Sequence, residues 1–245
     1  MIALQLRQYR LLATWQVEQV LVQIAVLVPI QFGLSGLLSI GLGHLAPEID
    51  ATAAQYLSTG APTLAVLTIG LLVLPQNLAQ EKFTGGAEFH RTVPASPVVR
   101  MAAMLTPHIV TTLPGALLAL WVAAAHFDFD ISPSPLALVA LAFVAMTGSA
   151  IGIAIATLSP HPLITSVVTN VALFFTMLFS PVNFPMERLP DGLQAVHDVL
   201  PIAPMAELVR STLVGATTDA ADWVRVGAWS VASFVIAAAF SARRT

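Results

Sequence analysis

Residues 81–97 read EKFTGGAEFHRTVPASP, a short charged stretch between two long apolar runs. It holds the only lysine of the chain, Lys82, together with two glutamates, one histidine and one arginine. A charged loop between two such runs is typical of a chain that crosses a membrane and returns. Its charges also offer a surface on which a soluble partner could act.

The composition supports a membrane protein. Of the 245 residues, 57% are hydrophobic and only 9% are charged, and the mean hydropathy is +0.83. A soluble domain carries about 25% charged residues. The chain has no cysteine, which excludes disulfides and thiolate metal sites. The net charge of −3 argues against a nucleic-acid partner.

Six apolar runs approach the roughly 20 residues needed to cross a hydrocarbon core of about 30 Å. We therefore predict an all-α membrane protein with a single domain over residues 1–245 and spans at 20–43, 56–80, 98–125, 136–158, 163–181 and 223–241. Residues 1–19 mix apolar residues with arginine and glutamine, which predicts an amphipathic interfacial helix or a cytosolic lead-in. Residues 182–222 are rich in proline and charge and predict two short helices, near 193–199 and 206–213.

The distribution of lysine and arginine predicts the orientation. With the N-terminus inside, the cytoplasmic set is Arg7, Arg10, Lys82, Arg91, Arg100, Arg243 and Arg244. The opposite set is Arg188, Arg210 and Arg225. We therefore expect both termini and the 81–97 loop in the cytoplasm.

The 81–97 loop has two interpretations. If residues 84–93 are helical, Phe89 and Val93 share one face, while Glu88 and Arg91 lie on the other. A helix this short needs a surface to dock on. The loop is then either a partner-docking helix that transmits movement into the neighbouring spans, or an ordinary charged loop that obeys the positive-inside rule.

Two stretches resemble ABC-2-type transporter permeases. The first is the order Glu81, Gly85, Glu88, Pro94 and Ser96, which is similar to the cytoplasmic loop of that family, although Gly86 and Ala87 follow where the family often has Thr or Ser. The second begins with SPVNFP at 180–185 and ends in an R-x-x-L-x-G pattern at Arg210, Leu213 and Gly215. It resembles the family's segment between the fifth and sixth spans.

The resemblance implies a permease subunit that pairs with a second, identical permease chain and binds two ATPase subunits. Residues 81–97 would form the coupling helix, with Glu81, Lys82, Gly85, Glu88, Phe89 and Arg91 at the ATPase. Residues 182–222 would form short extracytoplasmic re-entrant helices, with Pro185, Pro190, Pro201, Arg210 and Gly215. The chain has no G-x-x-x-x-G-K-[ST] phosphate loop, so we expect no cofactor in it, with ATP and Mg²⁺ held by the partner.

Three polar residues within the predicted spans are candidates for a translocation path: Gln31, His108 and Asn170. Each has a structural alternative. Neighbouring helices can satisfy Gln31, a carbonyl freed by Pro107 can bond a neutral His108, and Asn170 can join two helices.

Gly148 and Gly152 form a G-x-x-x-G pattern, which predicts close packing within the chain. Ser149 between them raises an intramembrane serine hydrolase as a much weaker alternative, because that chemistry needs a histidine within reach. The sequence contains no clustered metal-ligand spacing such as H-E-x-x-H.

We therefore expect a permease, not itself an enzyme, in the cell inner (plasma) membrane. It would export a small hydrophobic or amphipathic substrate, such as a drug, antibiotic or lipid-like molecule. A channel or scaffold without ATPase coupling is the alternative function.

Overall fold

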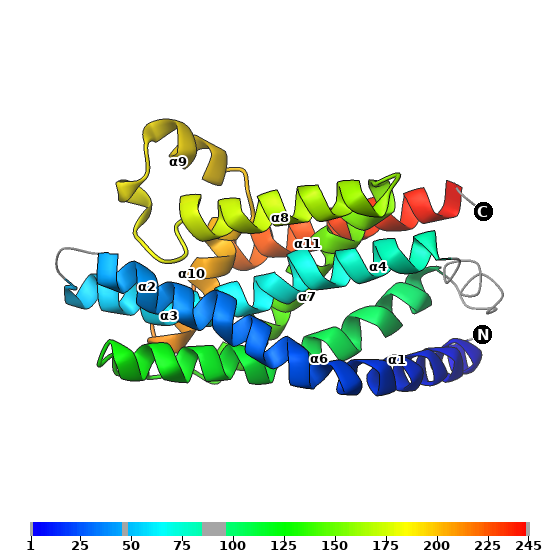
Figure 1. The fold of residues 1–245 in the computed structure, drawn as a ribbon, viewed down its shortest axis with the longest axis horizontal. Coiled ribbons are helices and arrows are strands. Elements are labelled where there is room, and N and C mark those ends of the chain that lie inside the picture. Colours follow the sequence, from blue (N-terminus) through cyan, green and yellow to red (C-terminus); the bar gives the residue numbers. More distant parts are fainter. Residues whose placement is uncertain (1, 46–48, 85–96, 244–245) are drawn as a thin grey trace.

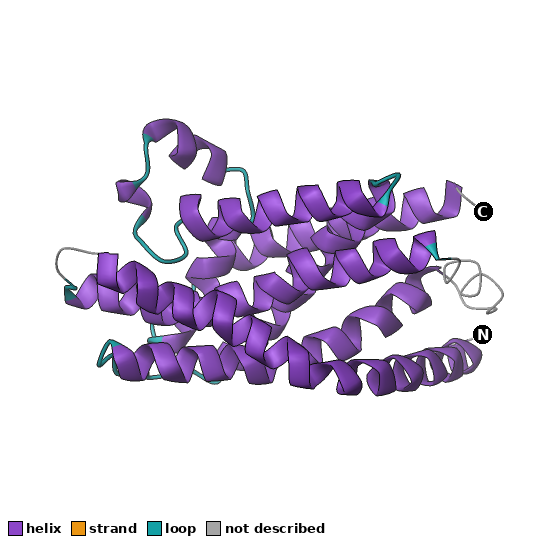
Figure 2. Cartoon of the chain, viewed as in Figure 1, coloured by secondary structure: helices purple, strands orange, loops and turns teal. Residues whose placement is uncertain are grey.

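The structure, a computed structural model, describes residues 2–45, 49–84 and 97–243, and its regular elements in these ranges are helical (Figure 2). Within the described ranges, six helices are long and apolar enough to cross a membrane, namely Val26–Leu45, Ala51–Phe83, Leu105–His126, Ala137–Leu158, Pro162–Phe179 and Ala220–Phe240. The predicted all-α, six-span fold class is thereby confirmed.

Figure 1 shows the order of the helices along the chain. The first part of the chain forms α1 (Ile2–Gln31), the π-helix η1 (Phe32–Gly36), α2 (Leu37–Leu45), α3 (Ala51–Thr68), the π-helix η2 (Ile69–Val73) and α4 (Leu74–Phe83). The second part forms α6 (Pro97–His126), α7 (Ala137–Leu158), α8 (Pro162–Phe179), the 3₁₀ helix η3 (Met186–Arg188), α9 (Asp191–His197), α10 (Ile202–Leu213) and α11 (Ala220–Arg243).

The N-terminal region differs from the expected arrangement. An interfacial helix or a cytosolic lead-in was predicted over residues 1–19, with a span starting at residue 20. Helix α1 runs unbroken from Ile2 to Gln31 and continues through η1 into α2, and an interfacial role of residues 1–19 stays a prediction. Its first half packs beside α6, where the Tyr9 hydroxyl donates to Thr106 Oγ1 at 2.8 Å. The continuous helix α1 therefore packs along α6. The polar composition of residues 1–19 did not reveal this continuity.

Helix α3 lies at the centre of the bundle, against α1, α2, α6, α7 and α10. It is rich in alanine, serine, threonine and glycine, and small side chains let neighbouring backbones approach closely. The buried hydroxyls of Thr59, Thr63 and Thr68 donate to the carbonyl four residues earlier. These three hydroxyls thereby find partners inside their own helix, as a dry environment favours.

The backbones of η2 and α7 are in close contact. A Cβ atom on Gly152 would lie 2.0 Å from the carbonyl oxygen of Gly70, and one on Gly70 would lie 2.7 Å from the carbonyl carbon of Gly148. The expected packing of the G-x-x-x-G pattern within the chain is confirmed. The π-helix η2 ends two residues before Pro75, whose missing N–H disturbs the regular hydrogen-bond pattern.

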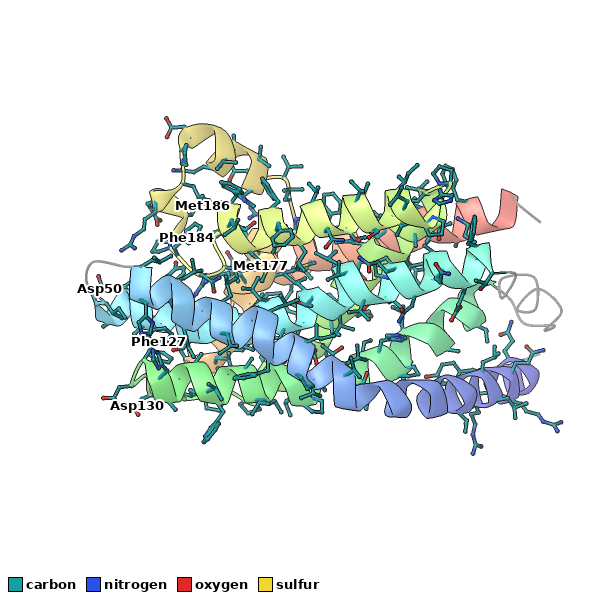
Figure 3. All side chains as sticks on the ribbon, viewed as in Figure 1. Asp50, Phe127, Asp130, Met177, Phe184 and Met186 are labelled. Carbon is teal, nitrogen blue, oxygen red and sulfur yellow. The ribbon has the colours of Figure 1, made fainter. Side chains whose placement is uncertain are left out.

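The two ends of the bundle differ. Helices α1 and α11 have their outer termini at one end, where α4 ends and α6 begins (Figure 1). Helix α9 lies at the other end, as do Asp50 and Asp130 (Figure 3). This arrangement agrees with the charge distribution, which predicted the termini and the 81–97 loop on one side.

The η2–α7 contact generates a stability prediction. We expect Gly152→Ala to lower the thermal unfolding temperature in detergent, since overpacking of this kind costs about 1–3 kcal/mol. Gly41→Ala is the control, because a Cβ there meets nothing within 4 Å and helical alanine gains about 0.5–1 kcal/mol over glycine. Equal melting shifts for the two variants would contradict the prediction.

Candidate functional site

At the end of the bundle that holds both termini, the last turn of α4 meets the end of α7. The Lys82 ammonium donates to the carbonyl oxygens of Ala156 at 3.1 Å, Thr157 at 3.2 Å and Ser159 at 3.1 Å. The last carbonyls of a helix have no partner inside it and carry the negative end of its dipole. Lys82 therefore caps the C-terminus of α7.

A ring contact lies beside this cap. The Phe83 ring meets the His161 ring edge-on, with centroids 5.0 Å apart. His161 Nδ1 accepts from the Leu163 backbone N–H at 3.1 Å, so His161 also caps the start of α8. We call Lys82, Phe83, Ser159 and His161 the inner junction, which joins the end of α4 to the α7–α8 turn.

Two of the predicted coupling residues belong to this region. Glu81 and Lys82 lie in the last turn of α4 and are partly buried. Gly85, Glu88, Phe89 and Arg91 fall outside the described residues. The coupling role of all six stays a prediction.

At the opposite end, Arg210 of α10 is nearly buried, with 6% of its side chain exposed. Its guanidinium donates to Glu207 Oε2 at 2.6 Å and to the carbonyls of Pro181 at 3.2 Å and Val182 at 3.0 Å. The same group lies 3.7 Å from the centroid of the Tyr56 ring, which favours a cation over its face. We call Tyr56, Glu207, Arg210 and the two carbonyls the outer clamp.

The loop held by the outer clamp also packs directly on α3. A Cβ on Gly60 would lie 2.3 Å from Asn183 Oδ1 and 2.8 Å from the Val182 carbonyl oxygen. Ser39 of α2 donates to the same Asn183 oxygen at 3.4 Å. A glycine at position 60 therefore leaves the space in which this loop sits.

The R-x-x-L-x-G pattern has a physical basis in this region. Arg210 forms the outer clamp, Leu213 is buried in the core, and Gly215 ends the helix with a φ of +68°. The loop before α7 covers the end of α10, since the Ser132 and Ser134 N–H groups donate to the Leu213 and Thr212 carbonyls. A side chain on Gly215 would meet Ser132 O at 3.0 Å, in addition to the strain of its positive φ.

Residues 182–222 contain the two short helices expected there, α9 and α10. Pro185, Pro190 and Pro201 each stand directly before η3, α9 and α10, respectively. His197 at the end of α9 is 1% exposed, stacks on Phe175, and lies with Nε2 2.7 Å from the Phe179 carbonyl oxygen. Sequence reasoning did not single out His197 or Tyr56, because their partners lie in other elements.

The three candidate path residues have different surroundings. Gln31 is fully buried, and its Nε2 donates to the carbonyls of Ala65 in α3 and Thr112 in α6, both at 3.2 Å. Gly115 leaves space for it, since a Cβ there would lie 2.1 Å from Gln31 Oε1. Gln31 therefore joins three segments in the interior.

His108 and Asn170, which the sequence treats as similar candidates, have different hydrogen-bond surroundings in the structure. His108 is 5% exposed within α6, where its carbonyl accepts from the Thr111 and Thr112 hydroxyls. Asn170 Nδ2 donates to Ser166 O at 2.7 Å and to Ser166 Oγ at 3.3 Å, so these bonds stay within α8 instead of joining two helices. A role of Gln31, His108 or Asn170 in a translocation path stays a prediction.

The geometry gives the hydrolase alternative no support. Ser149 is 3% exposed, in the segment of α7 that packs on Gly70. The two histidines that follow Ser149 in the sequence have partners elsewhere. His161 bonds at the inner junction, and His197, at the end of α9, contacts the Phe179 carbonyl. Within the described ranges, no group of three His, Cys, Asp or Glu residues could hold a metal ion.

Comparison with known proteins relates the chain to a family. The sequence model described as ABC-2 type transporter matches residues 2–214. The matched range begins with α1 and includes the inner junction and the outer clamp. No individual curated protein matches the chain.

The outer clamp generates a second stability prediction. We expect Arg210→Gln to lower the unfolding temperature in detergent, because each buried carbonyl left without a donor costs about 1–3 kcal/mol. The unfolding temperature of Arg210→Lys should lie between those of Arg210→Gln and the original chain, since lysine keeps the charge but loses the planar fork of the guanidinium.

Arg225→Gln is the matched control. Arg225 is 64% exposed and 4.0 Å from Asp222, and such surface pairs contribute about 0–1 kcal/mol. If Arg225→Gln lowered the unfolding temperature as much as Arg210→Gln, the outer clamp would be no stronger than a surface pair.

Proposed function

The chain belongs to the ABC-2 type transporter family, and on that premise we propose that it is the permease subunit of an exporter driven by a separate ATPase. The observation that carries the proposal is the family match over residues 2–214. The inner junction supports it, because the loop that would meet an ATPase starts from a turn of α4 fixed to α7.

We assign the energy source of transport to separate ATPase subunits. The sequence has no phosphate loop of the G-x-x-x-x-G-K-[ST] type, so ATP and Mg²⁺ belong to the ATPase subunits. Two such subunits serve a pair of identical permease chains, and residues 81–97 contact them. Glu81, Lys82, Gly85, Glu88, Phe89 and Arg91 form the coupling region.

The cargo is a small hydrophobic or amphipathic molecule. Exposed side chains on α8 and α11 are predominantly apolar, including Val167, Val171 and Phe174 on the first and Val231 and Val235 on the second. Such faces suit lipid, a second permease chain and an apolar cargo. The path runs between the two permease chains, and the segment held by the outer clamp covers its outer end.

The permease lies in the plasma membrane with both termini in the cytoplasm. The lysine and arginine distribution supports this orientation. The shared end of α1, α4, α6 and α11 is consistent with it (Figure 1).

The deciding experiment is a mild-detergent pull-down of the tagged chain from native membranes, with mass identification of the proteins that accompany it. We expect a stoichiometric soluble protein with a phosphate loop, which is lost with Glu88→Arg because charge reversal opposes docking. Arg225→Gln, at the opposite end, should retain it. Recovery of the chain alone, under conditions that hold known transporter complexes together, would favour the channel or scaffold alternative.

A separate variant tests the hydrolase alternative. Ser149→Ala removes only the hydroxyl, and we expect the ATPase pull-down and ATP hydrolysis by the complex to stay within about twofold of the original. A loss of any measured hydrolytic activity of the chain with Ser149→Ala would favour the hydrolase instead.

A further inference from the structure

We propose that Lys82 is a positioning residue that makes α4, the end of α7 and the start of α8 move as one unit. A displacement of the loop after α4 would then shift the fourth and fifth spans together with the second. The proposal rests on the proposed function for its role in transport, but the rigid unit itself can be tested on the chain alone.

The chemistry of the cap fits a lysine. An ammonium group has three N–H donors, and the three carbonyls of Ala156, Thr157 and Ser159 match them in number. The group stands at the C-terminus of α7, where the dipole of a helix favours a positive charge. Charge-assisted hydrogen bonds are about twice as strong as neutral ones. Lys82 therefore holds the α7 end more firmly than a neutral side chain could.

Further contacts join the same helices at other levels. Gln76 of α4 donates to Thr169 Oγ1 of α8 at 3.3 Å, and Phe83 packs on His161 in the α7–α8 turn. Deeper in the bundle, Gly70 of η2 contacts Gly152 of α7. These contacts hold α4 against α7 and α8 over its length, and Lys82 and Phe83 make the ones beside the loop.

The helix after the loop, α6, has different main neighbours, although it also contacts α7 and shares a buried cluster with α4 through Leu74 and Leu105. Helix α6 packs mainly on α1 and α3, with Tyr9 and Thr106 bonded across α1 and α6. The loop therefore begins on a unit that contains α4, α7 and α8 and ends on a helix beside α1. A force on the loop can change the position of one group of helices relative to the other, provided that Lys82 keeps the first group together.

The absence of cysteine permits a clean distance measurement. We would place spin labels at Asn77→Cys on α4 and Leu163→Cys on α8, two exposed positions, and reconstitute the chain in nanodiscs. With Lys82 present, we expect one narrow distance distribution between the labels. Lys82→Met should broaden and shift it, while Gln80→Met, an exposed change two residues earlier, should not. An unchanged distribution with Lys82→Met would overturn the proposal.

If Lys82→Met does not yield folded protein, Lys82→Gln replaces it. The amide keeps two donors but loses the charge, so we expect a smaller broadening of the same distribution. A distribution identical to that of the original chain would again overturn the rigid unit.

The second measurement uses the complex with its ATPase subunits. Labels at Leu178→Cys and Val224→Cys, exposed positions on α8 and α11, should report a distance change when the complex is trapped with ADP and vanadate. Lys82→Met should lose this change in complexes that still carry the ATPase subunits. A retained change would refute the positioning role. Failure of any ATPase to join the original chain would instead refute the proposed function, with the nanodisc result still deciding the rigid unit.

Discussion

The direct backbone contact between η2 and α7 is the constraint on which much of the bundle depends. Gly70 and Gly152 approach so closely that no side chain fits between them. This contact brings α4 alongside α7, and the two helices continue together until Lys82 reaches the last α7 carbonyls. Side chains at the crossing would separate the helices, and the cap would lose its geometry.

Both ends of the bundle use the same chemical device. A cation binds backbone carbonyls that lack a helical partner, Lys82 at the end of α7 and Arg210 at the loop after α8. Unsatisfied backbone groups are costly in a membrane, so irregular segments must be bonded by side chains. Each cation thereby fixes a connection to a helix far away in the sequence. In a transporter, the Lys82 connection lies next to the loop that is proposed to meet the ATPase. The Arg210 connection lies in the segment that is proposed to cover the outer end of the path.

Polar residues in the spans were ambiguous in the sequence, and their neighbours decided their roles. Gln31 bonds to carbonyls of two other helices because Gly115 leaves it space. Asn170 bonds within α8 because Ser166 stands one turn earlier, a local feature that the sequence already contained. The expected boundary near residue 19 is absent from α1, since polar composition does not end a helix that packs on α6. The interfacial role of residues 1–19 stays a prediction.

The sequence by itself determined the six spans, the helical fold class and the close glycine packing, because hydrophobic length and backbone hydrogen bonding are local properties. It also located the R-x-x-L-x-G pattern between the fifth and sixth spans. The glycine of this pattern ends α10 with a positive φ. The tertiary structure decided the partners of Lys82, the stacking of Arg210 on Tyr56, and the continuity of α1. The physical reason is that these contacts depend on the depth and face at which distant helices meet, which a hydropathy pattern does not record.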